Sequence, residues 1–129
     1  MRVFKSAWFV RFARREGISN LRLQDAVRRA NLGQVDADLG GGVVKQRVVR
    51  EGQGTSKGYR AIIVYREGES AFFVYGYAKS RRAGIRPDET EQFKRMAKHM
   101  LALSDAQVDA LIADGRFEEV ADYDQAVPE

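Results

Sequence analysis

Three stretches in the middle of the chain are rich in β-branched and aromatic residues and follow one another with short connections. They cover residues 43–50, 59–66 and 71–78, and the last two read YRAIIVYR and AFFVYGYA. Residues 67–70 (EGES) are a tight hairpin signal, whereas residues 51–58 form a longer, glycine-rich connection. Three successive strands joined in this way predict an antiparallel meander, and that meander limits what the rest of the chain can form.

Two short helices are predicted before the meander, because apolar residues recur there at helical spacing. Ser6 is a good N-cap for the first helix and Gly17 ends it, while Ser19 caps the second helix and Gly33 ends that one. Trp8 lies on the apolar stripe of the first helix, so we expect it to pack in the core. The brief turn between the two segments predicts a helical hairpin.

Further helices are predicted after the meander. Pro87 suits the first position of a helix, and acidic residues follow it in the positively polarised first turn. Met96 belongs to the apolar stripe of this helix and is expected to be buried. Ser104 and Gln107 form a capping-box pattern for the next helix, and residues 117–120 predict a last short strand.

The remaining segments complete an α+β domain. Residues 2–5 are short and are predicted to form an edge strand, while residues 36–42 contain three consecutive glycines and are predicted to form a loop. The expected architecture is an N-terminal helical hairpin packed on a small antiparallel sheet, with C-terminal helices.

Composition excludes several kinds of site. The chain has 129 residues and no cysteine, which excludes disulfides, cysteine-ligated metals and a thiol nucleophile. The single histidine, His99, lies off the apolar stripe of its helix and is expected to be exposed. No apolar run approaches the roughly 20 residues of a membrane helix, and no signal peptide is apparent. We therefore expect a cytoplasmic protein with no membrane partner, no metal and no cofactor.

Positive charge is concentrated in the middle of the chain. The net charge is +4, but residues 42–82 carry nine basic and three acidic residues, whereas residues 83–129 carry five basic and eleven acidic residues. A basic face on a domain that is not basic all over favours a polyanionic partner, of which nucleic acid is the usual one. Scattered, solvated arginines are the alternative explanation.

Basic and aromatic residues alternate through the predicted strands. Alternate residues of a strand share a face, so Lys45 and Arg47 point the same way. Arg60 is expected to be partly buried beside apolar neighbours, with its guanidinium placed to grip a phosphate. Residues 79–82 follow the third strand, and in a meander they approach the start of the strand before it. This approach to Tyr59 and Arg60 would gather several cations at one edge of the sheet. The alternating residues are Lys45, Arg47, Arg50, Lys57, Tyr59, Arg60, Arg66, Tyr75, Tyr77, Lys79, Arg81 and Arg82.

Tyr75 or Tyr77 is a candidate base-stacking platform for single-stranded nucleic acid. The alternative is that the tyrosines pack in the core and that the arginines cover the open face of the sheet.

Three segments of the sequence resemble the RelE/HigB family of bacterial toxins. They are residues 36–47 (DADLGGGVVKQR), 58–60 (GYR) and 72–80 (FFVYGYAKS), and the match follows nearly the whole chain. The resemblance implies a toxin of a type II toxin–antitoxin system, a ribosome-dependent endoribonuclease that cuts mRNA in the decoding site. It also implies a cognate antitoxin, such as a helix-turn-helix protein. Residues 1–120 would form one RelE-like toxin domain, with residues 121–129 as an acidic, frayed tail.

The resemblance also implies roles for individual residues. Lys45 and Arg47 correspond to the basic pair on the strand after the helices. Arg60 corresponds to the arginine of the family's Gly-Tyr-Arg motif, which clamps a phosphate. Lys79 and Arg82 correspond to the basic cluster after the last central strand, so these five are the candidate catalytic residues. Without a usable histidine, lysine and arginine would act chiefly by electrostatics, and no metal would be needed. The candidate RNA-binding residues are Arg50, Lys57, Arg81, Tyr75 and Tyr77.

The chain departs from the family pattern at two points. Ser80 stands where the family has an arginine directly after the lysine, so Arg81 or Arg82 would have to substitute for it. Residues 83–87 contain no tyrosine, although better-studied relatives have one there, and Tyr75 or Tyr77 is the candidate replacement. Two other functions remain open on this scaffold: a non-cleaving module that binds RNA or a partner protein, and a toxin directed at DNA gyrase.

Overall fold

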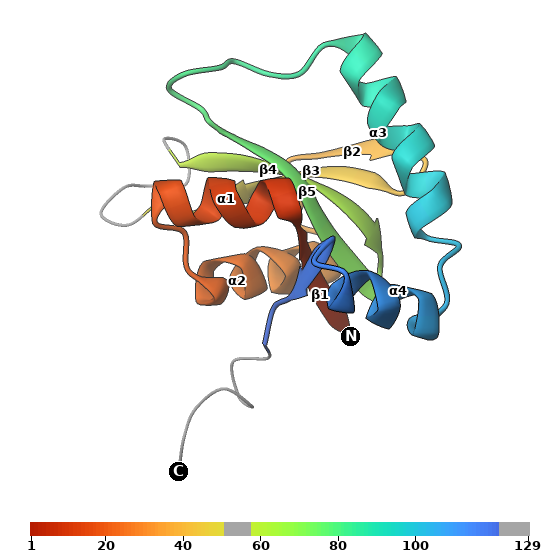
Figure 1. Ribbon diagram of the computed structural model, residues 1–129. Helices are drawn as coiled ribbons and strands as arrows, with labels where there is room; N and C mark the ends of the chain where they lie inside the picture. Colours follow the sequence, from red (N-terminus) through yellow and green to blue (C-terminus); the bar gives the residue numbers. More distant parts are fainter. Residues whose placement is uncertain (51–57, 122–129) are drawn as a thin grey trace.

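The computed structural model describes residues 1–50 and 58–121, which form four helices and six strands (Figure 1). Residues 51–57, which include Lys57, and residues 122–129 of the expected tail lie outside the described residues. The elements are β1 (Arg2–Ser6), α1 (Ala7–Glu16), α2 (Asn20–Asn31), β2 (Ala37–Gly40), β3 (Val43–Val48), β4 (Tyr59–Arg66), β5 (Ser70–Ala78), α3 (Pro87–Met100), α4 (Asp105–Ala113) and β6 (Phe117–Glu119).

The strands form one mixed sheet in the order β2-β3-β4-β5-β1-β6. The predicted meander is confirmed, because β3, β4 and β5 pair antiparallel in succession. The prediction of a purely antiparallel sheet is wrong, since β1 pairs parallel with β5. The prediction that residues 2–5 form an edge strand is also wrong, because β6 returns from the far end of the chain and pairs with the other side of β1.

The segment of residues 36–42 is not wholly a loop. Residues 37–40 form β2, which pairs antiparallel with β3, and the chain reverses through the glycines that follow. Gly40, Gly41 and Gly42 all have positive φ angles, a region that glycine enters without steric cost. The three consecutive glycines thus mark a tight hairpin between two strands rather than an irregular connection.

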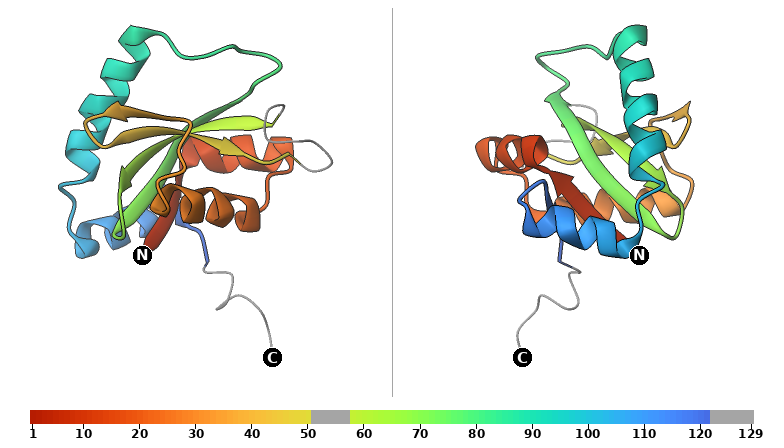
Figure 2. Two further views of the ribbon diagram at one scale, coloured as in Figure 1. Left: turned by 180° about the vertical axis from the view of Figure 1, so that it is seen from behind. Right: turned by 45° about the vertical axis from the view of Figure 1, so that its right-hand side comes forward.

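Helices cover both faces of the sheet. Figure 2 shows α1 and α2 on one side and α3 on the other. On the first side, Phe9, Phe12 and Leu23 pack with apolar residues of β3, β4 and β5. On the second side, Met100 of α3 and Val108 of α4 pack with strand residues that face the opposite way. A six-stranded sheet with one core on each face holds its central strands rigidly, and these are the strands that carry the basic residues.

Local sequence signals explain where the helices begin. The Ser6 hydroxyl accepts a hydrogen bond from the Phe9 amide at 3.1 Å, and Ser104 and Gln107 form the predicted capping box. His99 is exposed, as predicted. The predicted burial of Trp8 and Met96 is wrong, because these residues are 37% and 41% exposed.

Gly76 of β5 lies directly beneath α1, and we expect Gly76→Ala to destabilise the fold. A Cβ at this position would lie 2.7 Å from Cε2 of Phe12 and 3.0 Å from Cε2 of Phe9. Overpacking of this kind lowers the free energy of unfolding by about 1–3 kcal/mol. Urea unfolding measures the change, with Gly84→Ala as control because a Cβ there meets no atom within 4 Å. Equal midpoints for the two variants would contradict the expectation.

Candidate functional site

Strand register gathers the basic residues of β3 and β4 on one face of the sheet. Residues paired directly across neighbouring strands point to the same face. Two such rows cross β3, β4 and β5: one holds Arg47, Arg60 and Tyr77, and the next holds Lys45, Ile62 and Tyr75. Ile62 and Tyr75 belong to the core beneath α3, so both rows lie on the α3 side of the sheet. The predicted approach of residues from separate strands is confirmed for these groups.

Asp36 lies at the centre of this cluster. Its carboxylate is 3.4 Å from Nζ of Lys45, 3.3 Å from Nε of Arg47 and 3.4 Å from Nε of Arg60. The Asp36 side chain is only 16% exposed, and burial by itself raises the pKa of its carboxyl. The hydrogen bond from Arg47 and the charges of Arg60 and Lys45 outweigh burial, so the pKa of Asp36 lies below its usual value.

Arg60 and Tyr77 are the most deeply buried polar groups of the cluster, and each residue is 5% exposed. The Tyr77 hydroxyl has no hydrogen-bond partner among the described residues, although Arg60, Asp36 and Arg82 all act on it electrostatically. Burial raises the pKa of Tyr77, so at neutral pH its hydroxyl is a neutral hydrogen-bond donor.

Arg82 joins the cluster from the segment that leads from β5 to α3. Its Nη1 donates to the Tyr75 hydroxyl at 2.8 Å, its Nε donates to the Gly84 carbonyl at 2.7 Å, and its Nη2 pairs with Glu89 of α3. The guanidinium carbon lies 5.7 Å from the ring centroids of both Tyr75 and Tyr77. Arg82 is therefore held over the two tyrosines by three separate contacts. The resulting cluster consists of Lys45, Arg47, Arg60, Arg82, Tyr75, Tyr77 and Asp36, and we call it the basic cluster.

Comparison with known proteins assigns the chain to a family. The model of the RelE toxin of the RelE/RelB toxin–antitoxin system matches residues 1–120. The chain belongs to the RelE toxin family. No curated protein and no solved structure matches it. Membership of the family makes the chain a toxin of a toxin–antitoxin system, and it implies the ribosome and an antitoxin as partners.

The predicted site residues of this toxin do not all meet. Arg81 lies on the α1 side of the sheet, where its guanidinium is 3.6 Å from the Glu16 carboxylate. Arg50 lies there too, with its guanidinium carbon 5.7 Å from the ring centroid of Tyr59, which packs in the core beneath α1. Glu16, Arg50, Tyr59 and Arg81 line a pocket of about 530 Å³. The expected single cluster is thus divided between the two faces of the sheet.

Two further predicted residues lie apart from the basic cluster. Arg66 ends β4 at its far end and pairs with Glu69 in the hairpin turn. Lys79 follows β5, and its Nζ donates to the Ala83 carbonyl at 3.1 Å, which fixes the first turn of the segment leading to α3.

The tyrosine rings are less open than base stacking requires. Tyr77 is buried, and Tyr75 stacks on Trp8 with ring centroids 4.7 Å apart. Trp8 therefore covers one face of the Tyr75 ring, the Tyr77 ring is buried, and the Arg82 guanidinium carbon lies 5.7 Å from the centroids of both rings. Sequence reasoning placed Trp8 in the core, whereas it covers Tyr75 at the point where β5 extends beyond β1.

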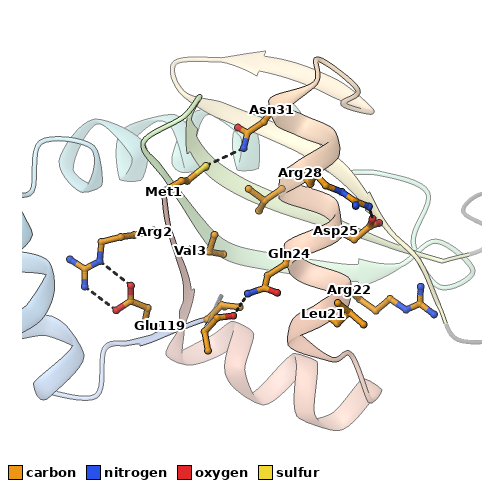
Figure 3. Close-up of a pocket in the computed structure, with 13 residues that line it drawn as sticks. Met1, Arg2, Val3, Leu21, Arg22, Gln24, Asp25, Arg28, Asn31 and Glu119 are labelled. Carbon is orange, nitrogen blue, oxygen red and sulfur yellow. Dashed lines mark hydrogen bonds and ion pairs between the residues drawn. The ribbon is translucent and has the colours of Figure 1, made fainter. Parts of the chain in front are cut away.

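A separate groove lies between α2, β1 and β6 (Figure 3). It has a volume of about 1060 Å³, and its lining includes Asn31, which contacts Met1, and Arg2, which pairs with Glu119. None of its lining residues belongs to the basic cluster. Within residues 1–50 and 58–121, no group of His, Asp or Glu side chains is placed to hold a metal ion, and no helix is long and apolar enough to cross a membrane.

The lowered pKa of Asp36 predicts how the stability of the toxin depends on pH. An unfolded aspartate titrates near about 3.9, so the stabilisation from its ionised form is fully present above that value. It is lost as the pH falls through the lower pKa of the folded state. Urea unfolding of the wild type and Asp36→Asn should therefore show a stability difference that is constant above about pH 5 and shrinks on acidification. A difference independent of pH down to acid unfolding would contradict this assignment.

Proposed function

We propose that this toxin is a ribosome-dependent, metal-independent endoribonuclease that cuts mRNA with the basic cluster. The observation that carries the proposal is the convergence of Lys45, Arg47, Arg60 and Arg82 beside two tyrosine hydroxyls on one face of a rigid sheet. Cations fixed by strands suit a phosphate whose charge must be stabilised during reaction.

The reaction follows from what such a site offers. The ribose 2′-hydroxyl attacks the neighbouring phosphorus, and its proton is lost as the new P–O bond forms. The bond from phosphorus to the 5′-oxygen breaks, and that oxygen takes up a proton, which leaves a 2′,3′-cyclic phosphate and a 5′-hydroxyl end. Negative charge on the phosphoryl oxygens rises on the way, and fixed donors near those oxygens contribute roughly 100–1,000-fold each.

Individual residues receive distinct roles in this proposal. Arg60, buried and held by Asp36, clamps the phosphate, and Arg47 presents its more exposed guanidinium to the same group. Lys45 adds charge, and Arg82 closes the other side over Tyr75. The Tyr77 hydroxyl donates a hydrogen bond to the phosphate or its ribose. Lys79 lies apart from the cluster and remains a proposed catalytic residue, and Arg50, Lys57 and Arg81 remain proposed RNA-binding residues outside the cluster.

The setting follows from translation. Translating ribosomes lie in the cytoplasm, so we place the action of the toxin there. The proposed antitoxin is a helix-turn-helix protein, and residues 1–120 form the proposed toxin domain, with the acidic residues 121–129 as its tail.

Cleavage of a defined mRNA tests the proposal. Purified toxin is mixed with the mRNA alone and with the same mRNA on purified ribosomes, and primer extension maps the new ends. We expect cuts only in the presence of ribosomes. Intact mRNA together with retained ribosome binding would instead indicate a non-cleaving module, and inhibition of DNA supercoiling in a parallel assay would indicate a gyrase-directed toxin.

A further inference from the structure

One carboxylate, that of Asp36, contacts three cations that come from two strands. Asp36 directly precedes β2, and the pairing of Ala37 with Lys45 places its side chain beside β3. From there it reaches Arg47 on the same strand and Arg60 on β4. The hairpin of residues 37–48 therefore delivers a negative charge to the point where the basic residues converge.

The contacts have a consistent geometry. Asp36 meets both arginines at Nε, the nitrogen nearest the side-chain stem, at 3.3 Å for Arg47 and 3.4 Å for Arg60. Within the described part of the chain, the terminal amino groups of Arg47 donate no hydrogen bond, and that side chain is 48% exposed. A carboxylate that holds a guanidinium at Nε fixes the direction of its fork and leaves the amino groups of Arg47 for another anion.

Electrostatics explain why the cluster needs this group. Lys45, Arg47 and Arg60 are like charges on adjacent strands, and Arg60 is buried, so an uncompensated cluster would pay both repulsion and desolvation. With Asp36 present the four groups still carry a net charge of +2. The cluster is thus held together without losing its attraction for a phosphate.

We propose that Asp36 is a positioning residue of the ribonuclease site, which aligns Arg47 and Arg60 on the phosphate of the RNA; this rests on the proposed function. Asp36 is not the general base. Three cations stabilise its ionised form, which makes it a weak acceptor for the proton of a ribose hydroxyl.

The test separates kcat from KM for cleavage of ribosome-bound mRNA. Asp36→Asn keeps the shape of the side chain and removes its charge. We expect kcat to fall by roughly 10–100-fold, as when an outer partner of a site residue is lost. KM should stay level or fall, because the loss of the carboxylate makes the net charge of the cluster more positive. Asp38→Asn is the matched control, since Asp38 lies two residues away and accepts a hydrogen bond from the Gly40 amide instead.

A second variant keeps the test decisive if Asp36→Asn does not fold. Asp36→Glu retains the charge and moves the carboxylate by one methylene. A positioning role predicts a folded protein that cleaves more slowly than the wild type. Wild-type kcat in Asp36→Glu, or an unchanged or raised kcat in folded Asp36→Asn, would overturn the proposal, because either result means that alignment does not limit the reaction.

A measurement without RNA separates this proposal from the proposed function. In the free toxin, the Nε–Hε groups of Arg47 and Arg60 give side-chain NMR signals that report the hydrogen bond from Arg47 to Asp36 and the ion pair between Arg60 and Asp36. We expect these signals to shift and their solvent exchange to accelerate in Asp36→Asn and not in Asp38→Asn. Unchanged signals overturn the positioning role even if the toxin cuts mRNA. Shifted signals in a toxin that cuts nothing leave the alignment intact and refute the nuclease assignment.

Discussion

Arg60→Lys is expected to lower the rate of mRNA cleavage on the ribosome by roughly 100–1,000-fold, the loss typical of one preorganised donor to a developing charge. Lysine keeps the positive charge beside Asp36, so that carboxylate retains three cationic neighbours. It replaces a planar fork by a single ammonium group, which cannot contact Asp36 and two phosphoryl oxygens in the same fixed geometry.

Single-turnover cleavage of a defined mRNA measures this effect, and growth arrest on expression gives the same answer in cells. Arg66→Lys is the matched control, because Arg66 ends the same strand at its far end and pairs only with the nearby Glu69 among the described residues. Its cleavage rate should equal that of the wild type. If Arg60→Lys remained as active as Arg66→Lys, Arg60 would not be the phosphate clamp.

The part of this site that sequence predicts well is the part set by strand alternation. Residues 59–66 and 71–78 alternate with a period of two, and the hairpin of residues 67–70 fixes their register. The hairpin register holds from Arg66 to Ile63, and a one-residue shift between Ile63 and Ile62 then places Arg60 beside Tyr77 rather than Gly76. Residues 79–82 lie close to the start of β4, where the Lys79 amide donates to the Gly58 carbonyl. The same alternation separates Arg50 from Lys45 and Arg47. Positions on one face of a strand differ by an even number, and Arg50 differs from positions 45 and 47 by five and three. The prediction of a single cluster did not take this alternation into account.

Asp36 and the place of β1 could not be predicted in the same way. Asp36 acts on Arg60 through two strand pairings, and the strand that Asp36 precedes, β2, is only four residues long and half glycine or polar. β1 joins the sheet between β5 and β6, which are about 70 and 115 residues away along the chain. Local periodicity carries no information about such distant partners, so a parallel strand inside the sheet was read as an edge.

Tyr77→Phe is expected to change activity and stability in opposite directions. The Tyr77 hydroxyl is buried and has no hydrogen-bond partner among the described residues, and such a group lowers stability by about 1–3 kcal/mol. Phenylalanine fills the same space without the hydroxyl, so we expect the free energy of unfolding to rise by about 1 kcal/mol. If the hydroxyl donates to the RNA, cleavage falls by roughly 10–100-fold, the worth of a hydrogen bond to a charged group.

Tyr75→Phe makes this expectation specific to position 77. The Tyr75 hydroxyl accepts a hydrogen bond from Arg82 at 2.8 Å, so its removal frees a guanidinium and should lower stability. Urea unfolding and cleavage rates of the two variants therefore form a pair in which only Tyr77→Phe becomes more stable while losing activity. A hydroxyl that lowers the stability of the free toxin and raises its cleavage rate serves to bind a ligand and not to stabilise the fold. If Tyr77→Phe cleaved at the wild-type rate, the hydroxyl would have no part in binding RNA, and Arg47, Arg60 and Arg82 alone would have to hold the phosphate.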